Sequence, residues 1–115
     1  MGNLKPDMSF PDDADGDALR RIARDGSDLS KPMEIDFAVT APSEGSARAI
    51  AKAAVSRGYR TDVERDDVGT WSCSCTREMI ATYEAVVERQ AELDALSRPL
   101  GGHVDGWGTA GNAPG

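Results

Sequence analysis

An alternation of apolar and polar residues near the middle of the chain limits its possible folds more than any other pattern. The apolar positions are Met33, Ile35, Phe37 and Val39, and they are separated by Glu34, Asp36 and Ala38. A period of two places successive side chains on opposite faces of a β-strand. The pattern therefore predicts a strand with one apolar face and one largely polar face, in a sheet covered on one side.

Helical patterns flank this strand. The aspartate-rich run from Asp12 precedes apolar residues at helical spacing and predicts a short helix that ends near Gly26. After the strand, Ser43 can cap a second helix that ends at Gly58. The expected apolar stripe of this second helix comprises Ala47, Ile50, Ala51, Ala54 and Val55.

The second half of the chain predicts a hairpin, a helix and a short strand. Residues 59–64 and 70–76 alternate, and the turn-forming residues 65–69 join them. Thr76 can cap a long helix that ends before Gly101. The predicted stripe of that helix is Met79, Tyr83, Val86, Leu93 and Leu100, and a short last strand starts at His103.

This order of elements predicts an α+β fold of the ferredoxin-like split β-α-β type. Two helices would cover one face of a four-stranded antiparallel sheet, and a short extra helix would precede it. We expect a disordered N-terminal tail at residues 1–11, one folded domain at residues 12–109 and a flexible C-terminal tail at residues 110–115.

The charge balance argues against direct binding of nucleic acid. The chain has 13 Lys and Arg residues against 20 Asp and Glu residues, a net charge of -7, and would repel phosphate backbones. No stretch approaches the roughly 20 apolar residues that cross a bilayer, and no basic segment followed by an apolar one begins the sequence. We therefore expect a cytoplasmic protein that does not bind membranes.

None of the reactive residues forms a convincing catalytic, cofactor or metal site. Cys73 and Cys75 would share the core side of one strand as reduced thiols, and the expected strand order separates them from His103, the single histidine. Residues 106–111 spell G-x-G-x-x-G, but no helix follows them as a dinucleotide site requires. The sequence predicts no enzyme, no cofactor and no metal.

Three glutamates on the last helix suggest a docking surface. Glu84, Glu88 and Glu92 are spaced four residues apart and lie on one helix face. Each like-charge pair at this spacing costs roughly 0.2 to 0.5 kcal/mol. The row is compatible with an ordinary solvated face, and also with a ridge that binds a basic, flexible partner.

Three segments together resemble the regulator of ribonuclease activity B family, whose members inhibit ribonuclease E. They are residues 24–28 (RDGSD), residues 47–63, which resemble the family's first core helix and next strand, and residues 104–109 (VDGWGT). The resemblance implies a ferredoxin-like regulator domain that binds the non-catalytic, partly disordered region of ribonuclease E. The loop at residues 65–69 is shorter than in the family, and residues 110–115 replace its acidic tail.

The final motif contributes three further candidate contact residues, namely Asp105, Trp107 and Thr109. A structural role is equally compatible with them, with the indole packed on the helices and the polar pair in a glycine turn. Our first hypothesis is a non-catalytic regulator that binds ribonuclease E or a similar RNA-processing enzyme. The alternatives are a small-molecule-binding or sensory domain with a pocket near Cys73, Tyr83 and Trp107, and an accessory enzyme subunit.

Overall fold

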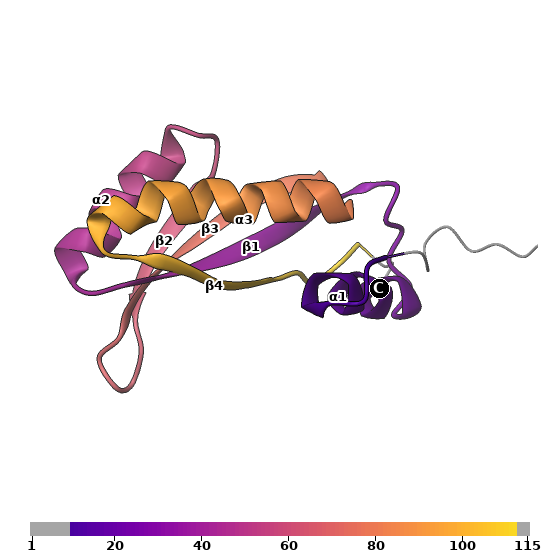
Figure 1. Cartoon of the computed structure of the whole chain (residues 1–115), viewed down its shortest axis with the longest axis horizontal. Helices are drawn as coiled ribbons and strands as arrows, with labels where there is room; N and C mark the ends of the chain where they lie inside the picture. Colours follow the sequence, from indigo (N-terminus) through magenta and orange to yellow (C-terminus); the bar gives the residue numbers. More distant parts are fainter. Residues whose placement is uncertain (1–9, 113–115) are drawn as a thin grey trace, which may run out of the picture.

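The computed structural model describes residues 10–112, and these contain three α-helices and one four-stranded sheet (Figure 1). Residues 1–9 of the predicted N-terminal tail and residues 113–115 of the predicted C-terminal tail lie outside the described residues. The elements are, in order, α1 (Ala14–Arg24), β1 (Pro32–Ala41), α2 (Glu44–Val55), β2 (Arg60–Arg65), β3 (Trp71–Ile80), α3 (Tyr83–Ser97), the 3-10 helix η2 (Arg98–Leu100) and β4 (His103–Gly108).

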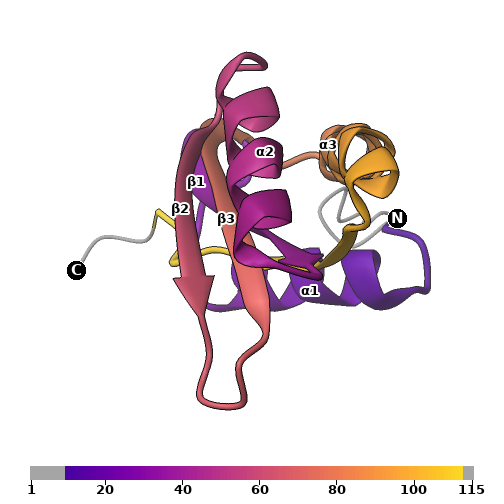
Figure 2. The ribbon, with the colours of Figure 1, turned by 90° about the vertical axis from the view of Figure 1, so that its left-hand side faces the viewer.

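The sheet is antiparallel throughout and has the strand order β2-β3-β1-β4. Helices α2 and α3 lie on the same side of it (Figure 2). This arrangement confirms the predicted α+β split β-α-β fold, including the extra N-terminal helix. Helix α1 lies at the opposite end of the molecule from α2, below the start of α3 in Figure 1.

Strand β1 supplies the centre of the core, as its alternation predicts. Ile35, Phe37 and Val39 are fully buried, whereas the residues between them are exposed. Full burial of each of these side chains stabilises the folded state by about 1.5–3 kcal/mol. The ring of Phe37 also meets Tyr59 edge-on, with 6.2 Å between ring centroids.

Helix α2 begins and ends where the sequence predicts. The Ser43 hydroxyl accepts a hydrogen bond from the Ser46 amide at 3.1 Å, and Gly58 has the positive φ of 96° that favours glycine. The predicted stripe is correct for Ala47, Ile50 and Ala54, which are buried, but wrong for Val55, which is 56% exposed.

The predicted start of the last helix is wrong. Residues 77–80 continue β3, because β1 extends back to Pro32 and offers them a full antiparallel ladder, in which Met79 opposes Met33. Thr76 is therefore a strand residue and does not cap a helix. Thr82 does so instead, since its side-chain oxygen accepts from the Ala85 amide at 3.1 Å.

The two cysteines and the histidine lie as the strand order requires. Cys73 and Cys75 are buried free thiols on β3 with their sulfurs 3.7 Å apart, and β1 separates β3 from β4, which carries His103. The hydrogen-bond contact with the Cys73 sulfur, followed by burial, raises the pKa of the Cys75 thiol. A protonated, enclosed thiol behaves as a small apolar group, so Cys75 acts here as a core residue.

Candidate partner-binding surface

The predicted glutamate row on α3 divides into two parts. Glu84 and Glu88 are exposed and form no ion pair with any residue between 10 and 112. Glu92, by contrast, is partly buried and forms ion pairs. Its carboxylate accepts a hydrogen bond from the Tyr59 hydroxyl at 2.8 Å. Arg57 and Arg89 each approach it at 3.3 Å. Two glutamates therefore remain free for a partner.

The contact with Glu92 changes the acidity of Tyr59. This residue is only 3% exposed, and its burial, followed by the hydrogen bond to Glu92, raises its pKa to about 12. Both effects disfavour a phenolate beside a carboxylate. Glu92 thus ties α3 to the segment that follows α2.

Carboxylates at the start of α1 lie beside the glutamates of α3. The sequence does not predict that they also bond to side chains of other elements. Asp13 caps α1 through the Gly16 amide at 2.8 Å and also accepts a bond from the Tyr83 hydroxyl at 2.6 Å. The bond from Tyr83, followed by that from Gly16, lowers the pKa of Asp13. Asp13 is therefore held ionised beside the first turn of α3.

Asp15 joins three elements through one carboxylate. It accepts from the Trp107 indole N–H of β4 at 2.8 Å and from the Gln90 side chain of α3 at 3.2 Å. The aspartate-rich run predicts a helix start, and this signal was correct, but the partners on α3 and β4 are 75 and 92 residues distant in sequence. No local pattern indicates such contacts.

The three candidate residues of the last motif have different surroundings. Trp107 is half-buried against α1, and the Thr109 hydroxyl donates to the Glu34 carbonyl and accepts from the Gly111 amide. Asp105 is exposed and falls at a β-bulge, since Ala38 and Val39 of β1 oppose Gly106 and Val104. Gly106 has a φ of 149°, which favours glycine there.

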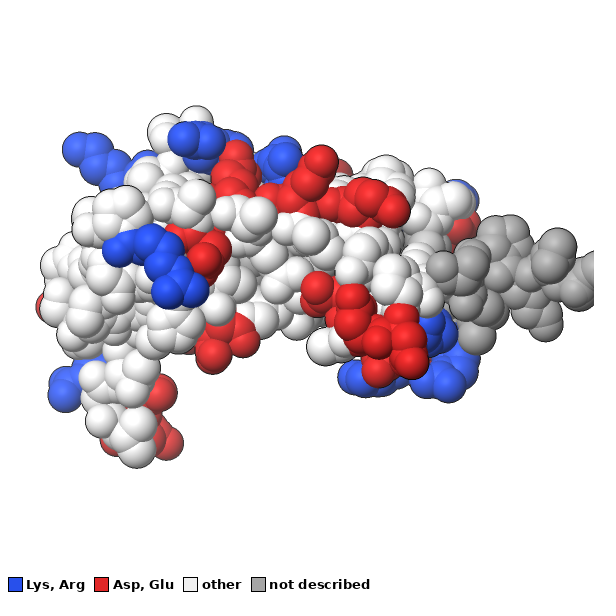
Figure 3. Space-filling model, viewed as in Figure 1, with Lys and Arg blue, Asp and Glu red and all other residues white. Residues whose placement is uncertain are grey.

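Six carboxylates at α1, α3 and β4 lie on neighbouring elements and form no ion pair with any residue between 10 and 112. We call the acidic face the set of Asp12, Asp13, Asp15, Glu84, Glu88 and Asp105. The bonds of Asp13 to Tyr83 and of Asp15 to Gln90 join α1 to α3, and a groove of about 370 Å³ is lined by both Asp15 and Asp105. Figure 3 shows red carboxylates along α3 and over α1, with an uncharged band between them.

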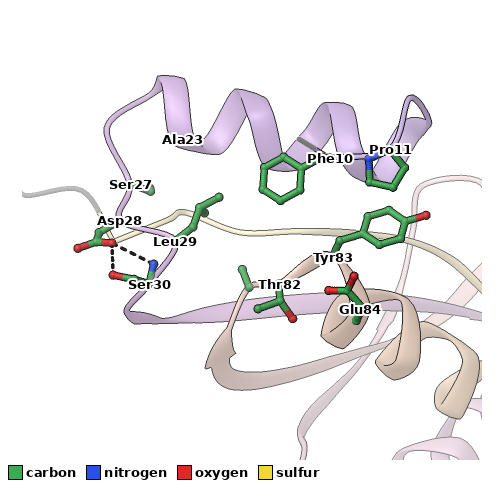
Figure 4. A pocket seen from close by; sticks show the side chains of 11 residues that line it. Phe10, Pro11, Ala23, Ser27, Asp28, Leu29, Ser30, Thr82, Tyr83 and Glu84 are labelled. Atoms are coloured by element: carbon green, nitrogen blue, oxygen red, sulfur yellow. Dashed lines mark hydrogen bonds between the residues drawn. The ribbon is translucent and has the colours of Figure 1, made fainter. Parts of the chain in front are cut away.

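A larger cavity of about 620 Å³ adjoins this face and runs along α1, between this helix and the start of α3 (Figure 4). Its wall includes Tyr83 and Glu84. Cys73 is enclosed in the core, and Trp107 lines the smaller groove instead. The three residues that suggested a small-molecule pocket therefore do not share this cavity.

These features define an α+β protein with one acidic, partly hollowed face. Between residues 10 and 112, none of the helices has the length and apolar character of a membrane span. Comparison with known families gives its class. The model of the family "Regulator of ribonuclease activity B" (RraB) matches residues 12–109, and the chain belongs to this family. No curated protein sequence matches the chain. Membership implies a non-catalytic regulator that interacts with a ribonuclease.

Proposed function

We propose that this protein inhibits ribonuclease E, and so slows RNA decay, by binding the enzyme's non-catalytic region through the acidic face. The observation that carries the proposal is the pair Glu84 and Glu88, which stand exposed and without ion pairs within the described residues, beside the α1 carboxylates. An unneutralised acidic face on a rigid scaffold attracts a basic polypeptide and sets its orientation. Binding then needs neither a cofactor nor direct contact with RNA.

The scaffold favours binding without a large change of shape. Tyr83, Gln90 and Trp107 fix the α1 carboxylates relative to α3 and β4 before any partner arrives. A face arranged in advance loses less conformational entropy on association than a flexible one. A disordered basic segment could therefore fold onto it.

An RNA-cleavage assay with two forms of the enzyme tests the proposal. The protein is expected to slow cleavage by full-length ribonuclease E and to leave unchanged an enzyme truncated to its catalytic domain. The inhibition should weaken as salt rises from 50 to 300 mM, an illustrative range over which the Debye length falls from roughly 14 to 6 Å. Equal inhibition of both enzyme forms, or none of either, would contradict the proposal.

A further inference from the structure

The cavity of about 620 Å³ has an apolar interior. Phe10 and Leu29 line it together with Ala23 of α1 and Ala81, which precedes α3. Figure 4 shows Phe10 and Leu29 between α1 and the start of α3. Its volume falls within the roughly 300–1,000 Å³ of sites that enclose small ligands or inserted side chains.

Two carboxylates stand on the wall of this apolar space. Glu84 belongs to the acidic face and forms no hydrogen bond or ion pair with residues 10–112. Asp28 accepts bonds from the Ser30 amide at 2.9 Å and the Ser30 hydroxyl at 2.6 Å, and these bonds lower its pKa. The two carboxylates lie at opposite ends of the cavity in Figure 4, and both favour a cationic ligand over an anionic one.

The loop that forms one wall is held in place from a distant part of the chain. The Asn112 side chain donates to the Asp28 carbonyl at 2.9 Å and to the Pro32 carbonyl at 3.2 Å, and its oxygen accepts from the Asp28 amide at 2.7 Å. The wall is therefore formed before binding. A preformed apolar cavity requires little reorganisation to accept a side chain.

From this combination we infer that the cavity binds an apolar side chain of the regulated enzyme, with a neighbouring Arg or Lys placed against Glu84. The inference rests on the proposed function and adds the chemistry of the bound segment, which is a short apolar-basic peptide. The charges of the acidic face attract the partner, and the cavity selects among its basic segments, since only those with an adjacent apolar residue fill it.

Titration calorimetry of the whole protein with overlapping fragments of the non-catalytic region of ribonuclease E tests this inference. With the tightest-binding fragment, Ala23→Trp, which fills the cavity without altering charge, is expected to weaken binding by about tenfold or more. Ala95→Trp places the same indole on an exposed position of α3 outside the cavity and should change affinity by less than about twofold. Replacing the fragment's apolar residue beside Arg or Lys with Ser should reproduce the loss.

A methyl NMR titration of the unsubstituted protein tests whether the fragment enters the cavity, even if Ala23→Trp fails to fold. The methyl signals of Leu29 and Ala81 are expected to shift on addition of the fragment. A fragment that binds while these signals stay fixed would overturn the cavity inference and leave the proposed function standing. If no fragment binds and ribonuclease E is not inhibited, both fail. Contacts from Leu4 or Met8 to Leu29 that persist in the complex would assign the cavity to the chain's own N-terminal segment and overturn the inference.

Discussion

The centre of the sheet and the junction of α1, α3 and β4 are built in different ways. At the centre, Phe37 and Val39 on β1 face Cys75 and Cys73 on β3, and all four are fully buried. At the junction, the half-buried Asp15 is held by hydrogen bonds from other elements. Apolar burial depends on area and tolerates similar shapes, whereas a carboxylate junction depends on particular donors. The comparison indicates that stability resides mainly in the sheet and that the junction positions the acidic face.

The largest effect is expected from a cavity at the centre of the sheet. Phe37→Ala should lower the free energy of unfolding by about 3–5 kcal/mol, because it removes a fully buried ring and leaves a void. Urea denaturation followed by circular dichroism measures this change. A loss below about 1 kcal/mol would mean that the sheet is not the main source of stability.

An intermediate effect is expected from Tyr59, where the core meets a carboxylate. Its pKa is raised from 10.0 to about 12 in the folded protein. A raised pKa adds stability that is complete below pH 10 and is lost as pH rises toward 12. Between these values the unfolding free energy of the wild type should fall by about 1–2 kcal/mol relative to that of Tyr59→Phe. Parallel pH curves for the two proteins would contradict the raised pKa that burial and the bond to Glu92 give Tyr59.

A smaller, local effect is expected at the junction. Trp107→Phe removes the indole donor to Asp15 and should cost about 1 kcal/mol. Hydrogen exchange should quicken in α1 and stay unchanged in β1. Trp71→Phe is the matched control, because that indole belongs to β3, lies under the Arg65 side chain of β2 and is away from α1. Faster exchange throughout the sheet after Trp107→Phe would remove the distinction between the two regions.

The smallest effect is expected at Val55, which helical spacing assigned to the core. Because this side chain is 56% exposed, Val55→Thr should change stability by less than about 0.5 kcal/mol. Thermal unfolding compares it with Ile50→Val, which shortens a fully buried side chain of the same helix and should cost about 0.5–1.5 kcal/mol. A larger loss for Val55→Thr than for Ile50→Val would contradict the observed orientation of α2.

Local sequence signals predict the sheet well and the junction poorly. The alternation in β1, the Ser43 cap and the Gly58 terminus depend on neighbouring residues, and the structure has all three. The spacing of residues 77–80 predicts a helix, but the ladder that β1 offers outweighs that preference.

The free carboxylates of the candidate surface are determined by tertiary contacts, which the spacing of residues in the sequence does not reveal. Glu84, Glu88 and Glu92 share one helical spacing, yet Tyr59 and Arg57 approach only the third. These partners are 33 and 35 residues away in the chain. Which carboxylate stays free is therefore decided by the tertiary arrangement, and sequence alone could supply only the set of candidates.

The most direct test of the acidic face compares two charge-reversed proteins with equal net charge. Glu84→Lys/Glu88→Lys alters the face, whereas Glu64→Lys/Glu78→Lys alters exposed glutamates on the uncovered side of the sheet. In calorimetric titrations with the non-catalytic region of ribonuclease E, the first protein should bind about tenfold more weakly than the wild type and the second within about threefold. Equal losses in both would show that only net charge matters and would contradict a specific acidic face.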